Sequence, residues 1–214
     1  MAFTLILTDD FTALDTKWDF DAYANFAYEL SGEQYVSSPT SLKLYATGST
    51  GTYECGVLSR DGSAQNVVEG RIVVSLWEGV YVGSRPLITF RNQAPLGTAT
   101  IEYGDCYFID FTSGAYVSLY RKIAGVEVDL GAFGTYQMPT ETWVKFRVTW
   151  WSDANGLNAK LESWNALTGV WDNLGTVQDI DDQWNASSIN RCGPGAAIHW
   201  LGDNKNYVDD IAIY

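Results

Sequence analysis

The sequence has little positive charge. Its 214 residues include 13 Lys and Arg against 26 Asp and Glu, which gives a formal net charge of −13. Binding to nucleic acid needs a basic footprint for the phosphates, so this balance disfavours a nucleic-acid partner and an anionic membrane surface. No apolar run approaches the roughly 20 residues that span a bilayer, so no membrane insertion is expected. With a hydrophobic fraction of 46%, the composition instead predicts an acidic globular protein.

Histidine and cysteine are also scarce. The single histidine, His199, disfavours a His-based metal site, and no G-x-S-x-G turn is present to position the serine of a Ser/His/Asp triad. The three cysteines, Cys55, Cys106 and Cys192, lack metal-ligand spacing, and an odd number cannot all pair within one chain. A disulfide framework is therefore not expected, although a single bridge stays open.

The N-terminus lacks the features of a secretion signal. It reads MAFTLILTDDF, with no basic segment, and its apolar stretch at residues 2–7 is too short for the core of a signal peptide. Three settings fit this start: a cytoplasmic protein, a secreted protein whose signal has been removed, or a virion protein that leaves the cell by lysis.

Strand signals are plentiful. Aromatic residues make up 14% of the chain, which also has 20 glycines, and this composition favours strands and turns over helices. The clearest alternation is at residues 143–151, which predicts a half-buried antiparallel strand. Its apolar face is Val144, Phe146, Val148 and Trp150. Its other face is Trp143, Lys145, Arg147, Thr149 and Trp151.

The predicted fold is all-β, an antiparallel sandwich or barrel. Roughly a dozen or more strands with short turns recur at the spacing typical of such folds. No proline-rich linker, low-complexity tract, charge step or internal repeat divides the chain, so residues 1–214 are predicted to form a single domain.

Four segments occur in an order that points to a particular sandwich. They are Asp9-Asp10-Phe11 followed by Trp18, residues 37–44 (SSPTSLKL), residues 143–148 (WVKFRV) and residues 207–214 (YVDDIAIY). Together they resemble the concanavalin A-like lectin/glucanase superfamily, in particular its laminin-G-like jelly rolls. The resemblance covers nearly the whole chain. It implies a concanavalin A-like jelly roll with one concave sheet, in which the first and last strands are neighbours.

Two acidic pairs are the candidate metal site. Asp9/Asp10 and Asp209/Asp210 would lie close together if the terminal strands pair, and Ca²⁺ takes six to eight oxygen ligands of this kind. The resemblance also implies a structural calcium, while no cofactor is required. The alternative is that one Asp of each pair caps a turn and the other faces water. A second acidic group at residues 179–182 lacks EF-hand spacing and is predicted to be a solvated loop.

Paired carboxylates for glycoside hydrolysis are missing. This chemistry needs two carboxyl groups about 5–9 Å apart, which the glucanases of the resembled superfamily supply from an E-x-D-x-E or E-x-D-x-x-E run. The chain has no such run, and Glu102 and Asp110 are stray candidates at the wrong spacing. Polysaccharide lyases of related shape use an Arg/Gln/His/Tyr set. This chain has only a weakly similar stretch, which begins at Tyr107. A non-catalytic protein is therefore expected.

Aromatic side chains outside the core are the candidate glycan site. The apolar C–H faces of sugars stack on Trp and Tyr rings, and Asp or Arg side chains bind sugar hydroxyls. For any single ring the alternative is a place in the core, to which Trp18 and Trp150 are assigned. The predicted glycan-binding residues are Trp77, Tyr81, Arg85, Arg91, Asp110, Trp151, Trp164, Trp171, Trp184 and Trp200.

The leading functional hypothesis is a non-catalytic, lectin-like recognition protein that binds a glycan or a protein surface. Proteins of the resembled fold work mostly outside cells, yet this chain shows no signal. A virion-surface or tail-associated protein reconciles these two facts, and a secreted module is the other extracytoplasmic setting. The alternatives are a structural decoration protein that contacts neighbouring virion subunits or further copies of itself, and a glycan-cleaving hydrolase or lyase.

Overall fold

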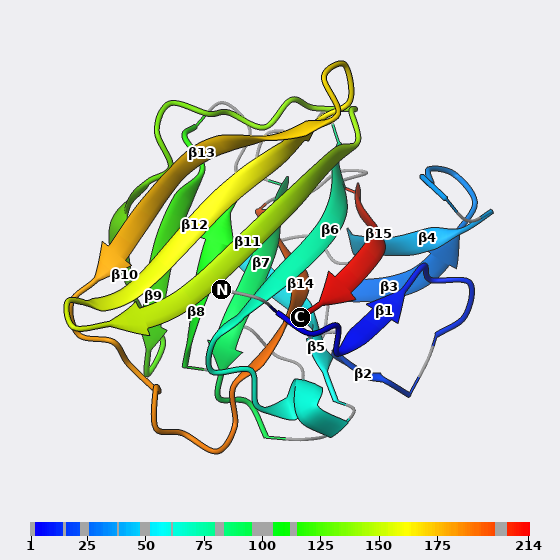
Figure 1. The fold of residues 1–214 in the computed structure, drawn as a ribbon. Helices are drawn as coiled ribbons and strands as arrows, with labels where there is room; N and C mark the ends of the chain where they lie inside the picture. The colour runs from blue at the N-terminus through cyan, green and yellow to red at the C-terminus, as the bar shows by residue number, and fades with distance from the viewer. Residues whose placement is uncertain are drawn as a thin grey trace.

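Two antiparallel β-sheets pack face to face (Figure 1). This arrangement, seen in a computed structural model, confirms the predicted all-β sandwich. The residues that the structure describes are 3–14, 16–21, 26–37, 39–47, 52–60, 62–79, 84–95, 105–111, 115–199 and 205–214.

Sheet A has eight strands in the described part of the chain. Their order is β13 (Val170–Asp179), β12 (Gly156–Asn165), β11 (Val144–Asp153), β6 (Gly70–Glu78), β15 (Lys205–Ile213), β4 (Ser41–Ala46) and β3 (Phe26–Ser31), and β1 (Leu7–Asp9) pairs with the C-terminal part of β15.

Sheet B has seven described strands. Their order is β10 (Val126–Ala132), β9 (Ser118–Ile123), β8 (Cys106–Asp110), β7 (Ser84–Asn92), β14 (Arg191–His199), β5 (Thr52–Ser59) and β2 (Trp18–Asp21). The helical content of the described residues is the short 3₁₀ turn η1 (Gly62–Gln65). No helix among them is long and apolar enough to cross a membrane.

The alternation of β11 divides its side chains between the core and the surface. Phe146, Val148 and Trp150 are completely buried between the sheets, as their spacing predicts. Lys145 and Arg147 lie on the opposite side and are partly exposed, because successive side chains of a strand point to opposite faces. We call the side of each sheet that is turned away from the other sheet its outer face.

Aromatic rings fill the space between the sheets. Trp150 of β11 stacks on Phe90 of β7 with 5.0 Å between ring centroids, and Phe90 stacks in turn on Tyr107 of β8 at 5.6 Å. Trp18 is 2% exposed and belongs to the same core, so both tryptophans assigned to the core from the sequence are found there. Aromatic pairs of this kind add about 0.5–1.5 kcal/mol beyond the area that they bury.

The first and last described strands meet in sheet A. Leu7 lies opposite Ile213 in the pairing of β1 with β15. A register shift in β15 after Asp209 marks a β-bulge, and Asp210 within it has a φ of 52°. The extra residue allows Val208 and Ile211, three positions apart, to be buried in the same core.

Arg191 is a completely buried cation that joins β14 to its surroundings. Its Nε donates to the carbonyl oxygen of Ser59 (2.8 Å), one Nη donates to that of Pro95 (2.9 Å), and the other bonds the Asp19 carboxylate of β2 (2.5 Å). Arg60 pairs with the other oxygen of the same carboxylate at 3.2 Å, but its side chain is 52% exposed. The two arginines therefore share one acid in different environments.

We predict that Arg191→Met destabilises the protein by about 3–5 kcal/mol, because it removes the buried partner of a buried carboxylate. Arg60→Met removes the exposed partner of the same carboxylate and should cost less than about 1 kcal/mol. Urea unfolding followed by tryptophan fluorescence measures both values. Equal losses in the two variants would contradict this assignment of Arg191.

Candidate functional site

The carboxylates predicted to bind calcium are held by separate sets of donors. Asp9 accepts hydrogen bonds from the Phe11 backbone N–H and the Trp18 indole N–H, both at 2.7 Å. Asp209 is completely buried and accepts the Val36 backbone N–H at 2.8 Å. Burial raises the pKa of Asp209, and the backbone donors oppose this effect. Asp9 therefore anchors the backbone two residues later, and Asp209 anchors a segment that is distant in the sequence.

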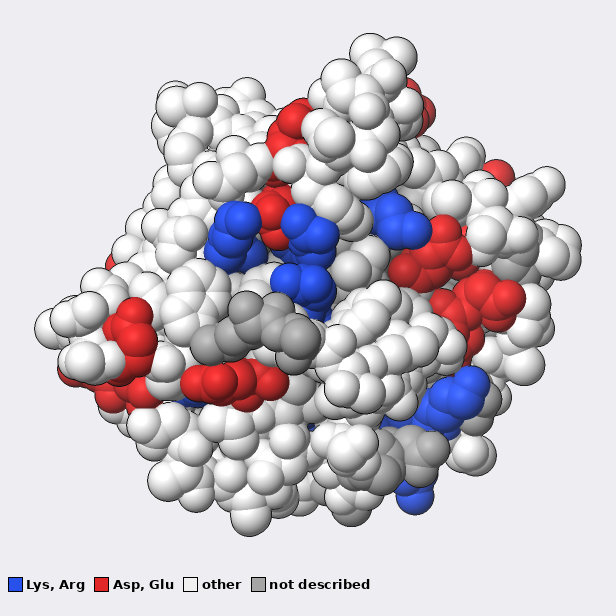
Figure 2. Space-filling model, viewed as in Figure 1, with Lys and Arg blue, Asp and Glu red and all other residues white. Residues whose placement is uncertain are grey.

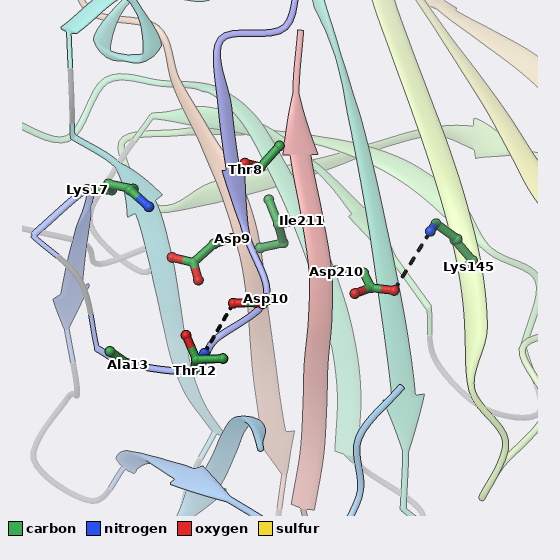
Figure 3. Close-up of a pocket in the computed structure, with 9 residues that line it drawn as sticks. All are labelled: Thr8, Asp9, Asp10, Thr12, Ala13, Lys17, Lys145, Asp210 and Ile211. Carbon is green, nitrogen blue, oxygen red and sulfur yellow. Dashed lines mark hydrogen bonds and ion pairs between the residues drawn. The ribbon is translucent and has the colours of Figure 1, made fainter. Parts of the chain in front are cut away.

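Asp10 and Asp210 line an open pocket of about 540 Å³ beside the paired ends of the chain, together with Lys17 and Lys145 (Figure 3). Figure 3 shows the two carboxylates turned apart, Asp10 toward the Thr12 backbone N–H and Asp210 toward Lys145, 3.8 Å away. Among the described residues, no three acidic, His or Cys side chains gather in a way that could hold a metal ion. The calcium site stays a prediction.

Four of the predicted tryptophans share the outer face of sheet A. Trp164 and Trp171 lie opposite each other on β12 and β13 and meet edge to face at 5.4 Å. Trp151 lies on the same side of β11, and Trp77 of β6 meets Tyr207 edge to face at 5.1 Å. The alternation of these strands places all four rings on the surface side of one sheet.

Charged side chains stand beside these rings. The Arg147 guanidinium lies over the Trp171 ring at 4.4 Å and donates to Glu162 at 2.6 Å, and Lys160 donates to the other oxygen of Glu162 at 2.8 Å. Burial alone would raise the pKa of Glu162, but the hydrogen bonds from Arg147 and Lys160 outweigh it and hold this pKa below its ordinary value. Figure 2 shows Lys and Arg side chains gathered near the middle of this face.

Arg71 of β6 is a further cation on the outer face of sheet A. Its Nε donates to the Thr149 hydroxyl at 3.1 Å, and its guanidinium lies 4.9 Å from the Phe3 ring. In the part of the chain that the structure describes, no carboxylate lies within ion-pair distance of it. Burial and then the charge of Arg147 lower the pKa of Arg71. We call Arg71, Arg147 and Lys160 the cation patch.

The outer face of sheet B carries a second group, which brings together two predicted residues from neighbouring strands. Arg85 of β7 forms an ion pair with Asp110 of β8 at 2.5 Å. Phe108 of β8 stacks on Tyr120 of β9 with 5.1 Å between centroids and 10° between planes. The Arg85 Nε is buried and has no hydrogen-bond partner among the described residues. We call these four residues the Arg85 cluster.

The environment of Tyr120 keeps its hydroxyl protonated. Burial and then the negative charges of Asp129 and Asp110 raise the pKa of this phenol above its ordinary value. The ring itself is half-buried. The cluster therefore offers a phenol donor, a carboxylate acceptor, a guanidinium donor and an aromatic surface within one part of a sheet.

Arg91 was wrongly predicted to contact a glycan. It is completely buried, where its guanidinium bonds Asp182 (2.5 Å), the Ser152 hydroxyl (2.6 Å) and the Val68 carbonyl oxygen (2.8 Å). Nor is the acidic segment at residues 179–182 a solvated loop throughout, since Asp182 is held by this arginine. Arg91 is a structural residue that joins β7 to the segment before β14.

Trp184, also predicted to bind glycan, packs against the core. Its ring meets Tyr107 edge to face at 5.2 Å. Asp179 of the same segment is buried, accepts the Tyr107 hydroxyl at 2.6 Å and pairs with Arg121 at 2.8 Å. The remaining predicted residues, Tyr81 and Trp200, lie outside the described residues.

No family model and no curated protein sequence matches this chain. Solved structures match over nearly its whole length. The structure of Cip1, a cellulose induced protein, has a TM-score of 0.57 and 20% identity, and covers 98% of this chain and 97% of that one. A variant of the Emp46p carbohydrate recognition domain has a TM-score of 0.58 and 10% identity, and the match covers 95% of this chain and 92% of that one. Lectin I from Ulex europaeus, in complex with the methyl glycoside of alpha-L-fucose, has a TM-score of 0.54 and 10% identity. The match covers 97% of this chain and 96% of that one.

The chain has the concanavalin A-like fold. This finding confirms the resemblance drawn from the four sequence segments. At identities of 10–20% the likeness concerns the path of the backbone. What the two outer faces of this concanavalin A-like sandwich bind has to be argued from their own side chains.

Several residues of these faces were missed or given no role from the sequence. Tyr120 and the charged residues Arg71, Lys160 and Glu162 were not singled out, and Arg147 was placed on the outer side of its strand without a function. The signal was present, because strand alternation puts Arg71 and Arg147 on the same side as Trp151. Their convergence depends on the register that pairs β6, β11 and β12.

We predict that Glu162→Gln lowers the free energy of unfolding by about 2 kcal/mol at pH 7, because charge-assisted hydrogen bonds from two cations are lost. The folded-state pKa of Glu162 is depressed, so its contribution is present above the unfolded value near 4.5 and is lost as pH falls through the folded value. Urea unfolding at pH 7 and pH 3 should show the difference from wild type shrinking at the lower pH.

Glu29→Gln is the matched control. Glu29 is 45% exposed, and its partner Lys43 keeps Glu33 at 2.9 Å. This change should alter stability by no more than about 0.5 kcal/mol. A pH-independent loss in Glu162→Gln would show that its charge has no part in the effect.

Proposed function

We propose that this protein is a non-catalytic carbohydrate-binding protein whose sugar site is the Arg85 cluster on the outer face of sheet B. The fold supports this proposal. Two of its structural neighbours are a carbohydrate recognition domain and a lectin in complex with a fucoside, and they cover 95% and 97% of this chain. The argument for the site itself rests on the residues of the cluster.

The observation that carries the proposal is the buried Arg85 Nε, which finds no hydrogen-bond partner in the part of the chain that the structure describes. A buried donor that makes no hydrogen bond costs about 1–3 kcal/mol, and native proteins contain few such groups. A sugar hydroxyl can accept from this donor once the Arg85 side chain shifts, because the Nε is closed to solvent in the free protein. The Arg85 side chain remains 18% exposed, so a ligand can reach part of it.

The other side chains of the cluster match the rest of a sugar's surface. The buried Asp110 carboxylate holds the Arg85 guanidinium in place, and the protonated Tyr120 hydroxyl can both donate and accept. The Tyr120 ring supplies apolar surface for the C–H face of a pyranose. Phe108, stacked on that ring at 5.1 Å, holds its orientation. The cluster therefore supplies the polar contacts and the aromatic contact from adjacent strands of one sheet.

The test begins with a glycan array probed with the purified protein, in Ca²⁺ and in EDTA. Loss of binding in EDTA would support the predicted calcium, and retained binding would count against a calcium requirement. Each bound polysaccharide is then incubated with the protein and sized. Shortened products would replace the non-catalytic proposal with the glycan-cleaving alternative. The virion setting is a separate prediction that this proposal does not use.

We predict that Tyr120→Ala weakens binding of the best array ligand about tenfold, which corresponds to about 1.4 kcal/mol. Tyr120→Phe keeps the ring and should lose less. Calorimetric titration measures both affinities.

Tyr116→Ala is the matched control, because Tyr116 is 52% exposed and precedes β9 outside the cluster. It should bind as wild type does. A folded protein that binds no glycan would overturn the proposal. Unchanged affinity in Tyr120→Ala would remove the site from the Arg85 cluster.

A further inference from the structure

We infer that the outer face of sheet A holds a second binding site, formed by the cation patch and Trp171, for a polysaccharide that carries sulfate or carboxylate groups. This site is independent of the Arg85 cluster, because the two lie on the outer faces of different sheets. It is argued from the charge balance, the spacing and the aromatic neighbours of the patch.

The patch is locally positive in a strongly acidic chain. The formal net charge of the protein is −13, yet the patch contributes three cations around the single carboxylate of Glu162. That carboxylate is only 7% exposed and is already shared by Arg147 and Lys160. Arg71 has no carboxylate in ion-pair range among the described residues, so the group retains an excess of positive charge.

This excess is unfavourable in the free protein. Arg71 is partly buried, and its burial and the charge of Arg147 lower its pKa more than Glu162 and Tyr214 raise it. An anion placed between the two would compensate both charges and form charge-assisted hydrogen bonds with free guanidinium N–H groups. Binding would thus remove a repulsion that the folded chain otherwise retains.

The spacing of the patch favours a ligand with several anionic groups. Arg71, Thr149 and Lys160 lie directly opposite one another across β6, β11 and β12. Neighbouring strands are about 4.8 Å apart, so the backbone positions of Arg71 and Lys160 are separated by about 10 Å. Arg147 stands in the next row. A single sulfate or carboxylate cannot span this row, whereas repeated groups along a polymer can.

The aromatic neighbours favour a sugar polymer. Trp171 lies under Arg147 at 4.4 Å, and Trp164 meets it edge to face. Trp164 is 39% exposed, and the Trp151 ring shares this face. Exposed tryptophan rings stack on the apolar faces of sugars. The low pI of the chain, near 4.3, acts equally against every long polyanion, so the choice of a sugar polymer over a nucleic acid rests on the exposed rings, and single-stranded DNA is an arm of the test.

The test compares dextran sulfate with uncharged dextran, and alginate serves as the carboxylated polymer. We expect binding to at least one charged polymer and none to dextran, with affinity falling as NaCl is raised because salt screens the contact. Arg71→Gln should weaken binding about tenfold, since it removes one charge-assisted contact. Among the described residues Arg71 has no carboxylate in ion-pair range, so this variant loses only the bond to Thr149 and the contact with Phe3, and its urea midpoint should fall only slightly.

Lys205→Gln is the matched control. It removes one positive charge from the same sheet, at a residue that pairs with Glu33 at 3.0 Å outside the patch. It should bind the charged polymer as wild type does, and so should Tyr120→Ala, which separates this site from the Arg85 cluster.

Four results would overturn the inference. The first is absence of binding to both charged polymers at low salt. The second is equal weakening by Arg71→Gln and Lys205→Gln, which would indicate a diffuse charge effect. The third is preference for single-stranded DNA over the charged polysaccharides, which would assign the face to a nucleic acid. The fourth is self-association that Arg71→Gln abolishes, which would assign the face to a second copy of the chain.

Discussion

The contact between Trp150 and Phe90 is the constraint on which the sandwich depends. The two rings come from different sheets and stack at 5.0 Å, so they fix which side of β11 and which side of β7 faces inward. Once these positions are set, the two-residue period of each strand assigns every neighbouring side chain to the core or to an outer face. A slip of one residue would expose Phe146 and Val148 and bury Lys145 and Arg147 in their place, which would lose apolar burial and desolvate two charges.

This assignment leaves polar and aromatic side chains on both outer faces, where they form two different environments. On sheet A, Glu162 is buried beneath Arg147 and Lys160 and its charge is stabilised there. On sheet B, Asp110 is buried beside Arg85, whose Nε has no hydrogen-bond partner within the described ranges. The first group is left with excess positive charge, and the second with an unmet hydrogen-bond donor. Each imbalance defines the chemistry that a ligand would have to supply.

Much of the framework could be predicted from local patterns. The alternation at residues 143–151 was enough to separate Trp150 from Trp151, because burial of one face is a property of neighbouring residues along one strand. The four segments, taken in their order along the chain, were enough to indicate the concanavalin A-like fold. These signals are short-range, or depend only on order along the chain.

The sites required information that local patterns do not contain. Arg85 and Asp110 are 25 positions apart and meet only because β7 and β8 are paired. Arginine is a residue type that often binds ligands. The backbone of Arg91 has a φ of 49°, however, and its side chain points into the interior, toward Ser152 and Asp182. Asp209 accepts hydrogen bonds from backbone N–H groups 172 and 173 positions away. In each case the partner of a charge is set by the sheet register, the bulges or the loop packing.

The two-sheet architecture also determines how the proposed sites relate to each other. A sandwich turns its outer faces in opposite directions, so one ligand segment cannot contact the Arg85 cluster and the cation patch at the same time. The close-packed core between them transmits little displacement unless an element has two arrangements. Ligands at the two faces should therefore bind without competition, and a chain with both sites would join two separate polymers. Such bridging needs no oligomerisation, because the fold itself presents both surfaces.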